Sequence, residues 1–160
     1  MASKRGVKRR FVRGVKKADK ENYREMLKIL DLGLEDRLST KVGLLSGGQR
    51  QALTLLMASM NKPKLLLLDE HTAALDPKTA AKVLEITDQI VHKHKLTTLM
   101  ITHNMQDAIA HGNRLIMMHE GRIVVDVEGE EKKKLTVEHL LSLFVKASGK
   151  VFADDRAILA

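Results

Sequence analysis

Two short polar stretches in this 160-residue chain combine residue types that can bind a phosphate and activate a water molecule. The first, Ser46-Gly47-Gly48-Gln49, runs into a helical pattern that ends at Met60. Uncrowded backbone N–H groups at the start of a helix, together with the helix dipole, favour a bound phosphate. The turn therefore predicts a phosphate contact, although serine and glycine are also ordinary residues at the start of a helix.

The second stretch is a pair of adjacent acids, Asp69 and Glu70, directly after four leucines at residues 65 to 68. Such a run is typical of a buried parallel strand, here expected over residues 64 to 68, and open α/β sheets bind ligands at the carboxyl ends of their strands. One carboxylate can hold Mg²⁺ through its water shell while the other orients or deprotonates an attacking water. The alternative is that both acids only solubilise the end of a strand.

Two further polar residues are candidates. His103 follows a β-branched, apolar run over residues 97 to 102, which predicts a second buried strand that ends at the same sheet edge as Glu70. A neutral imidazole can donate to a phosphate oxygen and accept from the backbone, but a histidine that is merely satisfied at a strand end is the alternative. Asp76 precedes Pro77, which predicts the cap and first residue of a helix.

The surrounding elements follow from apolar spacing and from helix-start residues. Asp19 is expected to cap a helix that Gly33 ends, and residues 130 to 134 are expected to be a solvated block of charge. Further predictions are a helix over 49–60 with Ala52, Leu53, Leu56 and Met57 buried, a helix from Pro77 with Val83, Ile86, Ile90 and Val91 inward, a short helix over 105–110, strands over 114–118 and 122–127, and a helix capped by Thr136.

In this order, the motifs resemble those of the ABC-type ATPase family. LSGGQ at residues 45–49 resembles the signature loop, LLLLDE at 65–70 the Walker B strand, AALD at 73–76 the D-loop, and His103 the switch histidine. The resemblance extends over about residues 20 to 144. It implies an α/β fold, a partial P-loop NTPase domain whose mostly parallel sheet is flanked by helices, with part of the helical signature subdomain.

The resemblance also implies site roles and cofactors, ATP and Mg²⁺. Glu70 would polarise the attacking water, Asp69 would lie on the Mg²⁺ side through water, and His103 would contact the γ-phosphate. Ser46, Gly47, Gly48 and Gln49 would close on the ATP of a second nucleotide-binding domain, and Asp76 would reach across the same dimer. His71 stands where the family usually has proline and is assigned no chemistry.

A phosphate-cradling P-loop requires the pattern Gly-x-x-x-x-Gly-Lys-Ser/Thr. No window of the sequence satisfies it, because the single Gly-Lys pair, Gly149-Lys150, is followed by valine. In the family the P-loop lies further upstream of the signature loop than the 44 residues that precede it here. We therefore expect the C-terminal part of a nucleotide-binding domain, beginning inside its helical subdomain, and negligible ATP hydrolysis by this chain alone.

The net charge of +8 is concentrated in the first 20 residues, which hold nine Lys or Arg and one acid. A solvated surface, a segment docking on an acidic or membrane partner, RNA binding and organelle targeting all remain open for this arm. The expected regions are the arm (1–19), the helical signature part (20–60), the catalytic α/β part (61–128) and a C-terminal helix and tail (129–160). Absence of cysteine excludes a disulfide scaffold.

The favoured function is the ATPase subunit of a membrane transporter, and the resemblance is strongest to bacterial importers, including those linked to uptake of aromatic amino acids. The subunit would lie on the cytoplasmic side of the membrane and contact transmembrane permease subunits. One alternative is a non-catalytic truncated or signature-only partner of another subunit. A second is a fragment of a soluble ribosome-associated ABC ATPase, although no specific nucleic acid is expected.

Overall fold

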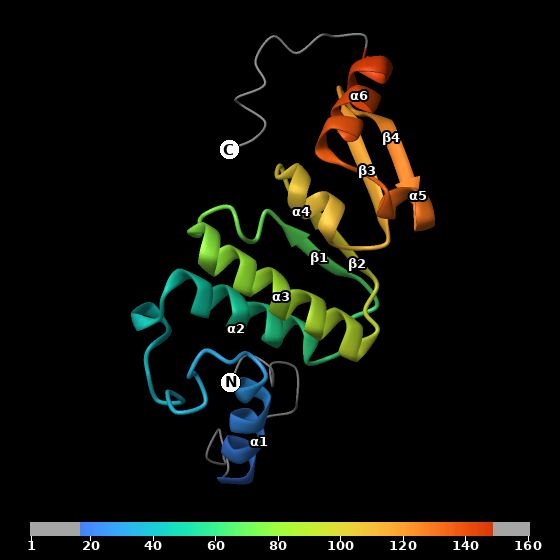
Figure 1. The fold of residues 1–160 in the computed structure, drawn as a ribbon. Helices are drawn as coiled ribbons and strands as arrows, with labels where there is room; N and C mark the ends of the chain where they lie inside the picture. Colours follow the sequence, from blue (N-terminus) through green and yellow to red (C-terminus); the bar gives the residue numbers. More distant parts are fainter. Residues whose placement is uncertain (1–16, 149–160) are drawn as a thin grey trace. The chain divides into compact units, whose positions relative to one another are not determined.

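The computed structural model describes residues 17–148, which form two compact units, one up to Ile101 and the other from Thr102 (Figure 1). This boundary falls inside the region 61–128 that the sequence suggested as one catalytic part. Most of the basic arm and the tail beyond residue 148 lie outside the described residues. No helix within residues 17–148 has the length and apolar character needed to cross a bilayer.

The first unit begins with α1 (Lys17–Lys28), which contains Asp19 in its first turn. The prediction that Asp19 caps this helix is therefore wrong, because the helix starts before it. The acid still lies at the end of the helix where the dipole favours a negative charge. Leu27 and the following Leu30 are buried in the core of this unit, as their spacing predicted.

Helix α2 (Gly47–Ser59) follows a short 3₁₀ turn, η2 (Val42–Leu44), and runs beside α3 (Pro77–His94) (Figure 1). It starts two residues earlier than predicted because Ser46 caps it. Its buried face also differs from the prediction, since Leu55 is buried whereas Met57 is 39% exposed. Ala52 and Leu56 are buried as expected.

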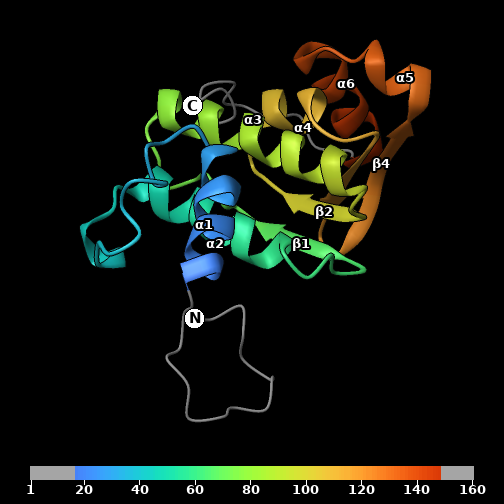
Figure 2. The ribbon, with the colours of Figure 1, turned by 90° about the horizontal axis from the view of Figure 1, so that it is seen from below.

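Strands β1 (Leu66–Asp69) and β2 (Thr98–Ile101) pair in parallel, which confirms the α/β class. The pair lies beside α2 and α3 (Figure 2), and within the described part of this unit these helices cover one of its faces. Leu66 and Leu68 are buried, whereas Leu67 is 64% exposed and Leu65, just before the strand, is 50% exposed. The prediction of a fully buried leucine strand is therefore wrong for every second leucine, because successive side chains of a strand point to opposite faces.

The ends of α3 follow from its sequence. Asp76 is the N-cap, Pro77 occupies the first helical position, and Lys95 ends the helix in a left-handed conformation with φ of 51°. Val83, Ile86 and Ile90 are buried as expected. These residues place α3 against the covered face of the strand pair.

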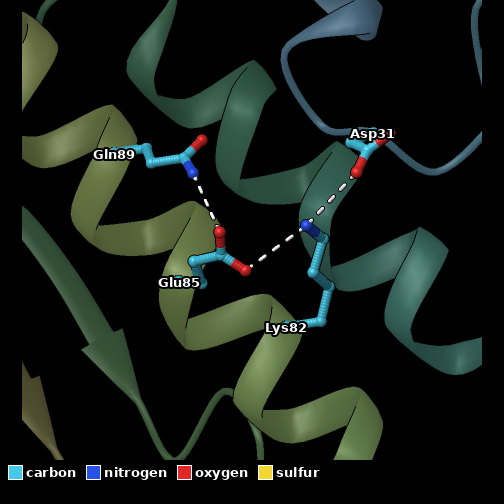
Figure 3. Close-up of polar contacts among 4 residues, drawn as sticks. All are labelled: Asp31, Lys82, Glu85 and Gln89. Carbon is cyan, nitrogen blue, oxygen red and sulfur yellow. Dashed lines mark hydrogen bonds and ion pairs between the residues drawn. The ribbon is translucent and has the colours of Figure 1, made fainter.

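An exposed polar chain connects α3 with the turn after α1 (Figure 3). Lys82 Nζ lies 3.4 Å from Asp31 Oδ2 and 3.3 Å from Glu85 Oε2, and Gln89 donates to Glu85 at 3.2 Å. Asp31 itself has a left-handed backbone, with φ of 51°. The contacts help to position the segment that leads to α2, although exposed ion pairs contribute little free energy.

The second unit consists of α4 (Met105–Ala110), a hairpin of β3 (Arg114–His119) and β4 (Arg122–Glu128), α5 (Gly129–Lys133) and α6 (Val137–Ser148). The antiparallel hairpin turns through Glu120 and Gly121, both with positive φ, and has an irregularity between Met117 and Met118. Its core consists of Leu115, Val125, Val127, Leu135 and Leu140.

Lys132 contradicts the prediction of a solvated charge block over residues 130 to 134. Lys132 is only 4% exposed, and its Nζ donates to the carbonyl oxygens of Ile109, at 2.5 Å, and His111, at 3.0 Å. The apolar stem is covered while the ammonium satisfies carbonyl groups at the end of α4. Burial lowers the pKa of Lys132 from its usual value.

Candidate functional site

The turn at Ser46 is a capping box. Ser46 Oγ accepts from the backbone N–H of Gln49 at 3.2 Å, and Gln49 Oε1 accepts from the backbone N–H of Ser46 at 3.1 Å. Gln49 Nε2 also donates to the carbonyl oxygen of Leu32 at 3.1 Å. The side chain of Gln49 therefore has a structural role that the sequence did not predict, joining the start of α2 to the segment after α1.

The exposed edge of this turn remains available to a ligand. Ser46 is exposed, and the first-turn amides of Gly47 and Gly48 have no hydrogen-bond partner within residues 17–148. Two amides at the N-terminus of a 13-residue helix provide donors and a favourable dipole for an anion. Gly48 is itself buried, so the exposed serine is the accessible edge of the turn.

The two glycines also allow α2 to approach the start of α3 closely. A Cβ atom on Gly48 would overlap Cγ2 of Thr79, and one on Gly47 would lie 3.0 Å from Cδ2 of Leu75. Gly48 is thus a packing residue irrespective of any ligand. The contact brings the signature-like turn next to the D-loop-like segment, two stretches that the sequence analysis identified separately.

Asp76 lies at the start of α3, beside this contact. Its Oδ1 accepts from the backbone N–H of Thr79 at 3.1 Å, and hydrogen bonds from Thr79 are the main cause of its lowered pKa. The side chain is exposed. The capping role of Asp76 is confirmed, while a contact across a dimer stays a prediction.

Asp69 and Glu70 lie at the carboxyl end of β1, and both are exposed. Glu70 has φ of 43°, a left-handed conformation that is unfavourable for a residue with a side chain. Backbone hydrogen bonds hold it on both sides, from Glu70 N–H to Ile101 at 3.0 Å and from Ala73 N–H to Glu70 at 3.0 Å. Such strain persists where the surroundings fix it, and it is frequent at functional sites.

His103 belongs to the second unit and is exposed. It precedes Asn104, whose backbone N–H donates to Thr102 Oγ1 and whose side chain caps α4 by accepting from Asp107 N–H, each at 3.1 Å. The position of His103 relative to Glu70 stays a prediction, as does its contact with a phosphate.

Sequence reasoning missed one contact of the acidic loop. His71, to which no chemistry was assigned, lies 3.1 Å through its Nε2 from Oγ1 of Thr87, a buried residue in the middle of α3. The two residues are 16 positions apart, and neither a motif nor a helical period relates them. The sequence held one indication of this contact, which is that Thr87, a polar residue, falls on the inner face of α3.

Comparisons with known proteins identify sequences that are similar to this chain. A family model described as ABC transporter matches residues 3–73. The tyrosine transport ATP-binding protein of Clostridioides difficile is 54% identical over 123 residues, which are 77% of this chain and 49% of that protein. An aliphatic sulfonates import ATP-binding protein of Albidiferax ferrireducens is 41% identical over 108 residues, 67% of this chain and 39% of that protein.

Solved structures share the fold. The ADP conformation of an ATP-binding cassette of an ABC transporter has a TM-score of 0.63 and 27% identity, covering 78% of this chain and 49% of that chain. The dimeric structure of a bacterial ABC transporter cassette has a TM-score of 0.55 and 29% identity, covering 73% and 50%. This chain spans about half the length of the relatives that it matches or less.

Proposed function

The chain belongs to the ABC transporter family of ATP-binding proteins, and from this premise we propose that it contributes a signature loop and an acidic pair to the ATPase of a bacterial importer. The observation that carries the proposal is the exposed pair Asp69 and Glu70 at the carboxyl end of a parallel strand. That is the edge at which open α/β sheets bind ligands.

The acids suit complementary roles toward a magnesium nucleotide. Mg²⁺ prefers oxygen ligands, keeps several waters and takes only one or two carboxylates besides phosphate oxygens, so an exposed Asp69 fits it. When bound, the ion would neutralise charge on the phosphates. Glu70 would orient a water and accept its proton. The fixed backbone on both sides of Glu70 supports this role, because a catalytic base must be held in position.

The turn at Ser46 serves a different nucleotide in this proposal. The exposed hydroxyl of Ser46 and the backbone amide of half-buried Gly47, which has no hydrogen-bond partner within residues 17–148, would contact the terminal phosphate of an ATP bound by a second domain, and Gly48 would support the turn through its packing on α3. The similarity to a cassette with a dimeric structure supports a second domain as the partner. His103 would also contact the terminal phosphate of an ATP.

The apolar residues that the described part of the first unit exposes on one face of the strand pair support an association with further polypeptide. Parallel sheets are normally covered on both faces, and a two-stranded sheet is marginal by itself. Leu99 and Ile101 of β2 are each 51% exposed on the same pair that exposes Leu65 and Leu67. We propose that a polypeptide carrying the P-loop covers this face, whether it is joined to this chain or a separate subunit.

The transport function rests on the relatives. Two of them are named for tyrosine transport and for import of aliphatic sulfonates. We propose the same broad role, with permease subunits as partners and a location on the cytoplasmic side of the membrane. Because the two relatives are named for different solutes, the proposal extends to import in general and not to one solute.

A direct test is the hydrolysis of Mg²⁺-ATP by the purified 160-residue chain. Since the sequence lacks a P-loop pattern, we expect phosphate release at the background rate for both the unchanged chain and Glu70→Gln. Turnover by the unchanged chain that Glu70→Gln abolishes would contradict the proposed dependence on a second polypeptide. It would at the same time support Glu70 as the base.

A further inference from the structure

The contact between His71 and Thr87 joins the acidic loop to the middle of α3. Thr87 is 4% exposed, and its Oγ1 lies 3.1 Å from His71 Nε2. His71 is half-buried and directly follows Glu70 in the chain. A side-chain contact at this place restrains the residue next to the proposed base.

The direction of the hydrogen bond follows from the threonine hydroxyl. Thr87 Oγ1 donates its one proton to the carbonyl oxygen of Val83, at 2.8 Å. The same oxygen can therefore only accept from His71, so Nε2 of the imidazole carries the proton. A proton at Nε2 is present both in the corresponding neutral tautomer and in the imidazolium, so this bond does not require a charged ring.

The contact between His71 and Thr87 lies next to a residue with a strained backbone, Glu70. Glu70 adopts φ of 43°, and its own N–H and C=O are bound to Ile101 and Ala73. Residues in this region revert to favourable conformations unless several contacts fix them. The bond from His71 is a side-chain contact that anchors the residue after Glu70 to the middle of α3.

We propose that His71 is a positioning residue, whose hydrogen bond to buried Thr87 holds the Glu70 turn in its strained conformation against α3. It acts through the backbone of Glu70 and touches no substrate. Only one part of the inference rests on the proposed function, which is that the tether affects hydrolysis if Glu70 is the base. The tether itself is testable without nucleotide.

The test is amide hydrogen exchange, measured by NMR on the full chain. Thr87→Val removes the hydroxyl at nearly constant volume, and we expect exchange at the amides of Glu70 and Ala73 to become on the order of two- to tenfold faster, the equivalent of one hydrogen bond. Thr87→Ser retains the hydroxyl, so exchange at these two amides should stay as slow as in the unchanged chain. The matched control is Thr54→Val, because Thr54 also donates to the carbonyl four residues earlier, at 2.8 Å, but is exposed.

A second readout is the ¹⁵N spectrum of the imidazole of His71. We expect the neutral ring to carry its proton on Nε2 almost completely in the unchanged chain and in Thr87→Ser, and to fall in Thr87→Val to the weaker preference for Nε2 that an unrestrained imidazole has. Should Thr87→Val perturb the fold, His71→Ala tests the tether from its half-buried partner by the same exchange measurement. Unchanged exchange at both amides in the folded variants, or a ring protonated on Nδ1, would overturn the proposal.

The outcome is separable from that of the proposed function. Altered exchange without any Glu70-dependent hydrolysis in a complete ATPase would leave the tether established and refute the role of Glu70. Hydrolysis that depends on Glu70, together with unchanged amide exchange in the folded Thr87→Val and His71→Ala variants, would support the role of Glu70 and refute the tether.

Discussion

Gly48 and Thr79 lie in such close contact that a methyl group on Gly48 would overlap Cγ2 of the threonine. The glycine is on α2 and the threonine on α3, so their contact determines how closely the two helices approach at their N-terminal ends. A glycine of the turn that we propose to bind phosphate is thereby also a packing residue. Loss of activity on its substitution would not by itself demonstrate a ligand contact.

Gly48→Ala is expected to destabilise the folded chain by about 1–3 kcal/mol, because a side chain forced into a packed contact displaces its neighbours. Urea unfolding without nucleotide measures this. The matched control is Gly43→Ala, since a Cβ at Gly43 meets nothing within 4 Å. Thr79→Ser removes the opposing methyl group and should recover most of the lost stability in the double variant, whereas equal stability of the two glycine variants would disprove the packing role.

Lys132→Met is expected to destabilise the second unit, because it removes the donor to two carbonyl oxygens at the end of α4 while keeping an apolar stem. The cost of leaving these acceptors without the ammonium is about 1–3 kcal/mol. Lys133→Met is the control, since the side chain of Lys133 is 71% exposed and pairs only with Glu130 among the described residues. Unfolding midpoints that shift equally in both variants would show that the buried contact contributes nothing specific.

The hairpin carries an acid-sensitive contact. Arg114 Nε and its terminal nitrogen lie 2.8 and 2.6 Å from the two oxygens of Asp126, and the hydrogen bond to Arg114 is the main cause of the lowered pKa of Asp126. The ionised form is favoured in the folded state, so its contribution is present above the ordinary pKa of 3.8 and is lost as the pH falls through the lower folded value.

We therefore expect Asp126→Asn to be less stable than the unchanged chain at pH 7, with a difference that shrinks as the pH falls below about 4. Unfolding by urea at a series of pH values gives the comparison. High salt should reduce the difference at pH 7, because both side chains are substantially exposed. A difference that persists unchanged down to pH 2 would exclude the ion pair as its cause.

The parts of the fold that the sequence predicts are those set by local chemistry. The Asp76-Pro77 start of α3 and the parallel strand pair follow from caps and apolar runs, and both are present. The burial of the leucine strand was overestimated because an all-leucine run has the same sequence whether one or both faces are covered. Coverage depends on elements distant in the chain, which the local pattern does not contain.

The features of the candidate site also divide into those that the sequence predicts and those that depend on residues distant in the chain. Ser46, Asp69 and Glu70 are exposed, as contact with a ligand requires, and the contacts themselves stay predictions. The tether from His71 to Thr87 and the buried Lys132 depend on tertiary contacts between residues 16 to 23 positions apart, which no short motif encodes. A charged residue in a polar run was assumed to be solvated, although a long side chain can reach buried carbonyl groups.

The central claim is that the turn at Ser46 faces a nucleotide held by another domain. Ser46→Asp tests it, because aspartate is as good a helix cap as serine but places a negative charge where the terminal phosphate would lie. The stability of this variant without nucleotide, measured by urea unfolding, should match that of the unchanged chain.

The decisive measurement is ATP-dependent association of this chain with the full-length tyrosine transport ATP-binding protein of Clostridioides difficile, followed by sedimentation. We predict association with Mg²⁺-ATP but not with Mg²⁺-ADP, loss of that association in Ser46→Asp, and its retention in Glu70→Gln. Association that is equal with both nucleotides, or that Ser46→Asp leaves intact, would contradict the account.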